Sequence, residues 1–230
     1  DRTGKRSPVF TNMVTPLRDK GWRQFIVFWG VLAFTANMAR PFAVPFLKED
    51  LGFPSSITAY ASGSLILGMV IGLTPWGRLA DRLGNKVVFL VNIILLGGAF
   101  VILALTPHYG SSAAMATAVS LIAFTTIGIA IGGLGIGHTV RQMHAAPSNS
   151  RSSYMAVFYT VNGLVGGAAT LISGAVLDQF PAVMHLGGLT LSPIRLFFAG
   201  TSILVLGTAV MLWRLDHVAE KPIQIVVVEF

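Results

Sequence analysis

Cysteine is absent from this 230-residue sequence, and charged residues make up only 11% of it. Without cysteine, the chain has no disulfide framework and no thiolate metal site. Soluble domains carry about 25% charged residues, whereas 53% of this chain is hydrophobic and its mean hydropathy is +0.73. The composition therefore excludes an ordinary soluble domain and indicates an integral membrane protein.

Acidic residues are also absent from the interior of every long apolar run. Those nearest the runs fall in predicted loops or at run ends: Glu49, Asp50, Asp81, Asp178 and Asp216. A buried Asp or Glu is the usual sign of a proton relay inside a membrane. The sequence therefore excludes a carboxylate relay within the predicted spans.

Signatures of catalysis are missing as well. There is no Gly-x-Ser-x-Gly segment and no acid paired with a deep histidine, so an intramembrane hydrolase is not indicated. We expect no enzyme activity, no catalytic residue, no cofactor and no metal site. The histidines fall at predicted span ends or in loops, without the spacing of metal ligands: His108, His138, His144, His185 and His217.

The sequence does contain six apolar runs of roughly 20 residues, the length that crosses a bilayer as a helix. We predict an all-α integral membrane fold with a basic cytoplasmic linker at 1–23, a six-helix bundle at 24–213 and a cytoplasmic tail at 214–230. The expected spans are 24–47, 56–77, 87–106, 113–137, 154–177 and 195–213.

The basic residues follow this topology. The net charge is +7 and the pI is near 10.3. With the amino end inside, thirteen Lys and Arg fall in cytoplasmic segments and only Lys48 and Arg195 in the opposite loops. This asymmetry predicts that both ends are cytoplasmic, in the plasma membrane or a bacterial inner membrane. It also argues against nucleic-acid binding, for which a basic patch would be needed.

The first span holds the main candidates for a substrate cavity. Asn37 and Arg40 are three residues apart and share a helix face beside Phe34. Arg40 lies about 12 Å from Lys48 at the outer end, so it is either cavity-facing, a snorkelling anchor or a donor to backbone carbonyls. Pro41 and Pro45 are expected to break the helix there and free carbonyls that need partners.

Other spans offer weaker signals. Tyr159 and Asn162 share one face of the fifth span, where each is either a cavity residue or an interhelical hydrogen-bonding group. The second, fourth and fifth spans are rich in glycine, which lets helix backbones approach closely in lipid. We expect close packing there, and we reject a nucleotide loop at 132–137 because no strand precedes it.

The segment at 77–86 carries a resemblance to a known family. Gly77, Asp81, Arg82, Gly84 and Lys86 resemble the cytoplasmic signature Gly-x-x-x-Asp-Arg/Lys-x-Gly-Arg/Lys-Arg/Lys of the major facilitator superfamily, from which Asn85 departs. In that family this loop joins the second and third helices of each six-helix half, which is where it falls here. The resemblance covers roughly residues 10–216.

The resemblance implies one half of a twelve-helix carrier. Three features favour the carboxyl-terminal half: the basic linker at 1–23, the degenerate signature and the loop at 146–151. The sequence is therefore expected to be a fragment. On this interpretation the first and fourth spans line a central cavity, the second and fifth face the missing amino-terminal half, and the third and sixth are peripheral. Asp81 and Arg82 either act together as a latch that holds the cytoplasmic side closed, or have separate local roles. In the second case Asp81 caps a helix and Arg82 only follows the positive-inside rule.

The function expected from this resemblance is secondary active or facilitative transport of a small solute by alternating access. Arg40 favours an anionic or polyhydroxylated solute. Two alternatives remain: a half-size transporter that pairs with a second copy, and a non-transporting membrane scaffold. The expected partners are the bilayer, the solute and the missing half or second copy.

Overall fold

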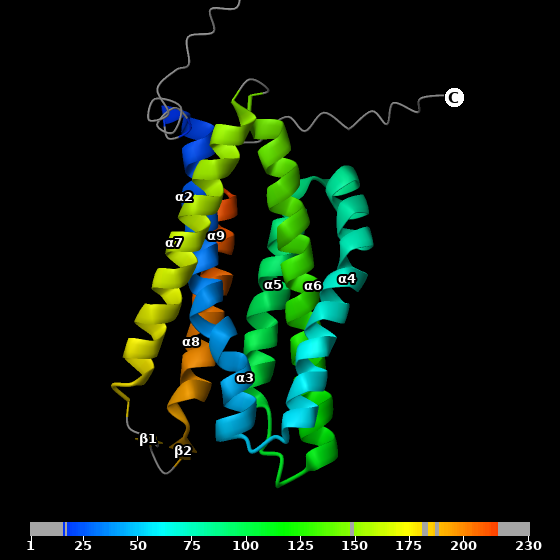
Figure 1. Ribbon diagram of the computed structural model, residues 1–230, viewed down its shortest axis with the longest axis vertical. Helices are drawn as coiled ribbons and strands as arrows, with labels where there is room; N and C mark the ends of the chain where they lie inside the picture. The colour runs from blue at the N-terminus through cyan, green and yellow to red at the C-terminus, as the bar shows by residue number, and fades with distance from the viewer. Residues whose placement is uncertain (1–15, 17, 148–149, 181–183, 187–188, 216–230) are drawn as a thin grey trace, which may run out of the picture.

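A computed structural model describes residues 16, 18–147, 150–180, 184–186 and 189–215. Most of the predicted linker and nearly all of the predicted tail lie outside these residues. The described part of the chain is a bundle of long helices (Figure 1) and contains six that are long and apolar enough to cross a membrane. The predicted all-α membrane fold is therefore confirmed.

The six candidate spans extend beyond most of the predicted apolar runs. The first is composite and runs from Lys20 to Asp50 as α2 (Lys20–Ala39), η1 (Arg40–Phe42), α3 (Ala43–Pro45) and η2 (Phe46–Asp50). The others are α4 (Ser55–Leu83), α5 (Asn85–Leu105), α6 (Ala113–Ala145), α7 (Arg151–Leu177) and α8 (Pro193–Gly207) with α9 (Ala209–Leu212).

A short hairpin joins the fifth and sixth spans. Strands β1 (Met184–Leu186) and β2 (Leu189–Leu191) pair antiparallel, with Met184 opposite Leu191. These strands were not predicted from the sequence, because three residues are too few for a recognisable alternation of apolar and polar side chains.

Glycines hold α4 and α6 together. A Cβ on Gly68 would overlap the backbone of Thr125, and a Cβ on Gly128 would overlap the backbone of Leu65. Only a residue without a side chain lets two helices approach this closely, and in lipid such contact replaces the hydrophobic effect as the force between helices. The close packing predicted for the second and fourth spans is confirmed.

The remaining helices pack around aromatic side chains. Helix α2 lies beside α7 and α8, whereas α5 contacts α6 and α8 (Figure 1). The rings of Phe25 on α2 and Phe158 on α7 are stacked with centroids 5.7 Å apart, and Phe28 meets Phe89 on α5 at 5.4 Å. Such pairs stabilise by about 0.5 to 1.5 kcal/mol beyond the burial of their area.

The helices alternate in direction, so the start of α2, the α4–α5 junction and the α6–α7 junction lie at one end of the bundle (Figure 1). Most of the described basic residues gather at that end: Arg18, Lys20, Arg23, Arg78, Arg82, Lys86, Arg141, Arg151 and Arg214. The opposite end carries the α5–α6 loop and the hairpin.

Candidate functional site

The first span changes helix type at η1 (Arg40–Phe42), which contains Pro41. Proline has no N–H, so the carbonyl of Asn37 loses the donor that a regular α-helix would supply. The hydroxyl of Thr170 on α7 lies within hydrogen-bonding distance of that carbonyl oxygen at 3.4 Å, and also of the Gly166 carbonyl at 3.2 Å. The chain meanwhile tightens into η1, where the Ala43 N–H donates to the Arg40 carbonyl. The predicted break is confirmed, and one freed carbonyl finds its partner on another helix.

A cavity of about 210 Å³ lies beside this break. It is bounded by the first span together with α5, α6 and α7. Its lining is nearly half polar, and its polar side chains come from three different spans. The residues are Trp29, Leu32, Ala33, Ala36, Asn37, Arg40, Leu96, Ile131, Leu134, Gly135, His138 and Asn162.

Arg40 is the one permanently charged side chain in this lining. Its side chain reaches the surface of the described bundle, and within the described part of the chain its guanidinium has no hydrogen bond and no ion pair. Of the three roles left open for Arg40, donation to backbone carbonyls is therefore not observed among these residues. No Asp or Glu lines the cavity, so the lining carries a net positive charge.

Two hydrogen bonds fix the amides in the cavity. The indole N–H of Trp29 donates to Oδ1 of Asn162 at 2.8 Å, which joins α2 to α7. The Nδ2 group of Asn37 donates to the Ala33 carbonyl one turn earlier at 2.7 Å. Each amide is therefore oriented by the protein and still has capacity for a further hydrogen bond.

The structure also brings His138 into the cavity, which the sequence analysis missed. Its ring lies 4.7 Å from that of Trp29 and 5.2 Å from that of Phe158, and Nδ1 is 3.0 Å from Nε2 of Gln142. The predicted fourth span ended at residue 137, whereas α6 continues to Ala145. The available signal was the lack of a helix breaker before Pro147.

The predicted cavity residues divide into two groups. Asn37, Arg40 and Asn162 line the same cavity, although they come from spans far apart in the sequence. Phe34 is half-buried and does not line it. Tyr159 is 56% exposed on α7 and meets the His138 ring edge-on at 6.5 Å, outside the lining.

The signature segment is not the loop that the sequence suggested. Gly77, Asp81 and Arg82 belong to the last two turns of α4, and Lys86 lies in the first turn of α5. The junction is Gly84 alone, with φ of 83°, a conformation that favours glycine. Asp81 and Arg82 are exposed and form no ion pair or hydrogen bond with other described residues.

Arg195 has a structural role at the opposite end of the bundle. Its guanidinium donates to the carbonyls of Ala104 at 2.8 Å and Thr106 at 2.6 Å, where α5 ends. It also lies over the ring of Phe46 at 5.7 Å. One side chain therefore joins the first, third and sixth spans, satisfying carbonyls that a helix end leaves without donors.

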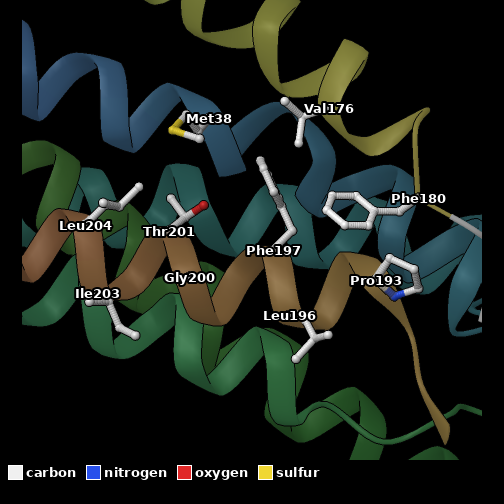
Figure 2. Close-up of a pocket in the computed structure, with 10 residues that line it drawn as sticks. All are labelled: Met38, Val176, Phe180, Pro193, Leu196, Phe197, Gly200, Thr201, Ile203 and Leu204. Carbon is white, nitrogen blue, oxygen red and sulfur yellow. The ribbon is translucent and has the colours of Figure 1, made fainter. Parts of the chain in front are cut away.

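A larger groove of about 560 Å³ lies between α8 and the outer ends of α2 and α7 (Figure 2). Thr201 is the one polar side chain among the ten lining residues, and Figure 2 shows it among Met38, Phe197 and Leu204. Ile203, at the edge of the groove, is 70% exposed. A groove with this lining suits hydrocarbon and has no groups to select a polar solute, so the smaller cavity is the candidate site.

A family model described as "Major Facilitator Superfamily" matches residues 25–227. A Haemophilus influenzae protein named "Putative metabolite transport protein" is 25% identical over 150 residues. That match covers 65% of this chain and 33% of the relative, so the matched part of this chain spans about a third of the relative's length.

Proposed function

Because the chain belongs to the major facilitator superfamily, a family of membrane transporters, we propose that it is one half of a carrier that moves a small solute by alternating access. The observation that carries this proposal is the cavity between the first, third, fourth and fifth spans. The cavity is lined by the guanidinium of Arg40, the amides of Asn37 and Asn162 and the imidazole of His138. It lies beside the break in the first span, and broken helices are the usual setting of a transport site.

The proposed solute is a small organic anion. Arg40 has no counter-ion in the described cavity, and an unpaired charge in a membrane costs about 2.5 to 3.5 kcal/mol on insertion scales. A solute carboxylate would supply the missing charge through paired hydrogen bonds. A polyhydroxylated solute is the second candidate, because the amides of Asn37 and Asn162 suit hydroxyl groups.

The proposed partner is the amino-terminal six-helix half of the same carrier. This assignment is supported by the exposed faces of α4 and α7. A Cβ added at Gly163 or Gly167 would meet nothing within 4 Å, and Leu164 and Leu171 are 70% and 76% exposed. The open space beside these glycines would let another helix approach α7 closely, and the exposed leucines would then be buried against it. A second copy of this chain is the alternative partner.

We assign the basic end of the bundle to the cytoplasm, in the plasma membrane or a bacterial inner membrane. The positive-inside rule supports this orientation. Asp81 and Arg82 then lie at the cytoplasmic end of α4, exposed and free to contact the partner half. We propose that they latch that side closed while the carrier is open outward.

The test is uptake of labelled succinate, benzoate, gluconate and glucose by cells that express the full-length carrier. We expect Arg40→Ala to reduce uptake of the transported anion by at least about tenfold, because a hydrogen bond to a charged group contributes about 1.5 to 3 kcal/mol. Arg214→Ala, which removes an exposed arginine outside the cavity, is the matched control.

Three results would contradict the proposal in different ways. A scaffold would take up none of the four probes. A carrier whose site lies elsewhere would lose no more activity with Arg40→Ala than with Arg214→Ala. A gene that starts immediately upstream of the Asp1 codon would favour the homodimer over the two-half carrier.

A further inference from the structure

The groove between α8 and the outer ends of α2 and α7 contains a buried hydroxyl group without a partner. Thr201 is 2% exposed, and its hydroxyl has no hydrogen-bonding partner among the described residues. Figure 2 shows the oxygen on the groove side of α8, turned toward Met38 and Phe197. A buried polar group without a partner is costly. The hydroxyl therefore favours an occupant of the groove that brings an acceptor.

The rest of the lining restricts the chemistry of that occupant. The other nine lining residues have no nitrogen or oxygen in their side chains. Since none of these described residues is charged, an ion would enter the groove without a counter-charge, which is costly inside a bilayer. Phe180 and Phe197 supply two aromatic rings, which pair well with a further ring in offset or edge-on contact. The lining therefore suits a neutral, aromatic molecule.

The depth of Thr201 separates such a molecule from a membrane lipid. Thr201 follows Pro193, the first residue of α8, by eight residues, or about 12 Å along the helix. The hydrocarbon core of a bilayer is about 30 Å thick, so the hydroxyl lies near the middle of the sixth span and well below the ester and headgroup oxygens of lipids. An acyl chain would fill the groove but leave the hydroxyl without an acceptor.

The groove has the size and the opening that such a molecule needs. Its volume is about 560 Å³, within the range of about 300 to 1,000 Å³ that is usual for sites of small molecules. At its edge Leu196, Ile203 and Leu204 are 38%, 70% and 50% exposed in the described bundle. A compound dissolved in the bilayer can therefore enter from the side.

We propose that this groove binds a neutral aromatic molecule with one hydrogen-bond-accepting oxygen, which enters from the bilayer and accepts a hydrogen bond from Thr201. The apolar walls hold its rings, and the hydroxyl fixes the position of its oxygen. The groove and the candidate transport cavity share no lining residue. The ligand is therefore distinct from the transported solute.

The groove also lies against the break in the first span. Met38 precedes Arg40 by two residues, and the ring of Phe197 meets that of Phe42 in η1 edge-on at 6.0 Å. A molecule in the groove would oppose any movement of η1 into that space. Its binding should therefore slow transport without competing with the solute. This consequence rests on the proposed transport function, whereas the binding itself does not.

Benzophenone can test the site, because its two rings and single carbonyl oxygen place it in the proposed class. On irradiation its carbonyl abstracts hydrogen from a nearby C–H group, and the two resulting radicals combine into a covalent adduct. Methionine is a favoured target. Met38 lines the groove, whereas Met115 on α6 is 60% exposed outside it. In the purified full-length carrier in phosphatidylcholine nanodiscs, labelling of Met38 should saturate and labelling of Met115 should rise in proportion to benzophenone.

Thr201→Val tests the hydrogen bond, because it keeps the shape of the side chain and removes the hydroxyl. At subsaturating benzophenone we expect labelling of Met38 to fall about fivefold, the factor for one ordinary hydrogen bond, with labelling of Met115 unchanged. Ser202→Ala is the matched control. It removes the adjacent hydroxyl, which donates to the Gly97 carbonyl and does not line the groove, so labelling of Met38 should persist.

Two competitors test the same bond from the ligand side in the wild-type protein. Fluorene and fluorenone have the same rings, and only fluorenone has an oxygen. Protection of Met38 should need about fivefold less fluorenone than fluorene. This comparison decides the role of the hydroxyl even if Thr201→Val fails to fold, because equal protection would overturn it.

Two other occupants would give different results. If lipid chains fill the groove, labelling of Met38 will be unsaturable and insensitive to Thr201→Val. If another part of the carrier covers the groove, Met115 will be labelled and Met38 will not. Either result would overturn the proposal.

The effect on transport is measured separately, in proteoliposomes kept in the dark. Benzophenone should lower the maximal rate of anion uptake without changing the solute concentration that gives half of it, and Thr201→Val should need about fivefold more benzophenone for the same effect. Unaffected uptake, with Met38 labelled as expected, would overturn the inhibition and leave the binding site. Uptake of no anion would contradict the transport function and its inhibition, while the labelling still decides the binding site.

Discussion

The hydroxyl of Thr170 on α7 lies 3.4 Å from the carbonyl oxygen of Asn37 on α2, the carbonyl that Pro41 leaves without its helical donor. The contact joins residues 133 positions apart and lies one turn from Arg40. The helix break therefore lies in one span and the replacement hydrogen-bond donor in another, and the position of the cavity wall depends on both.

Thr170→Val should reduce stability by about 0.6 kcal/mol and by no more than about 1.7, the range measured for hydrogen bonds between membrane helices. In a Pro41→Ala background the same change should cost almost nothing, because residue 41 then supplies its own N–H to Asn37. The four proteins of this cycle can be compared by unfolding in detergent. Equal losses in both backgrounds would refute the assigned role.

Adjacent residues on α8 give a second prediction. Thr201 and Ser202 are 2% and 1% exposed, yet the Thr201 hydroxyl has no hydrogen-bonding partner among the described residues, whereas Ser202 donates to the Gly97 carbonyl at 2.8 Å. Thr201→Val should be neutral or slightly stabilising, because it removes an unsatisfied polar group. Ser202→Ala should cost about 0.6 to 1.7 kcal/mol. Thermal unfolding of the two variants checks this, and the reverse order would contradict it.

The α4–α6 contact predicts a steric effect. Gly128→Ala would press a methyl group against the backbone of Leu65, with Met69 N only 2.9 Å away. We expect a loss of about 1 to 3 kcal/mol, the usual cost of overpacking. Gly98→Ala on α5 is the control, since a Cβ there meets nothing within 4 Å. It should stabilise by about 0.5 to 1 kcal/mol through helix propensity, and the unfolding transitions of both variants measure the contrast.

Asp81→Asn tests the proposed latch. The change removes a charge from an exposed turn of α4 and leaves the side chain nearly the same size. If Asp81 holds the cytoplasmic side closed, transport should slow by about tenfold, the loss of one charge-assisted hydrogen bond, while insertion stays normal. Unchanged uptake with normal insertion would refute the latch, and the alternative role of Asp81 as a helix cap is not observed, because no described helix end receives a hydrogen bond from it.

Much of the fold was predictable because the bilayer limits what a chain can do. Six runs of about 20 apolar residues had to become helices, since only helices and closed barrels satisfy the backbone in lipid. Pro41 and the glycines of the second and fourth spans also gave correct predictions, because each acts through backbone chemistry that the residue type fixes.

The errors arose where helix length and membrane thickness differ. The number of apolar residues reports only the part of a helix that lies in the hydrocarbon layer. The signature segment was therefore predicted to be a loop, although α4 continues through Arg82 to Leu83. For the same reason His138 was placed at a span end, two turns before α6 stops at Ala145. Helices end at breakers such as Gly84, and not where the apolar residues run out.

Side-chain partners between spans could not be predicted at all. Asn37, Arg40 and Asn162 were chosen because polar groups are rare in spans, and the cavity that joins them depends on helix packing. Trp29 gave no signal of its hydrogen bond to Asn162, which lies 133 positions away. Arg195 was counted only as a loop charge.

The junction made by Arg195 bears on how the carrier would respond to its surroundings. Its two acceptors are neutral carbonyl oxygens, which neither gain a proton in acid nor attract counter-ions as a carboxylate does. Arginine itself stays charged at any physiological pH. The outer ends of three spans are thus tied by two hydrogen bonds whose acceptors do not titrate, and the one nearby group whose charge changes with pH and acts on Arg195 among the described residues is the carboxyl of Asp50.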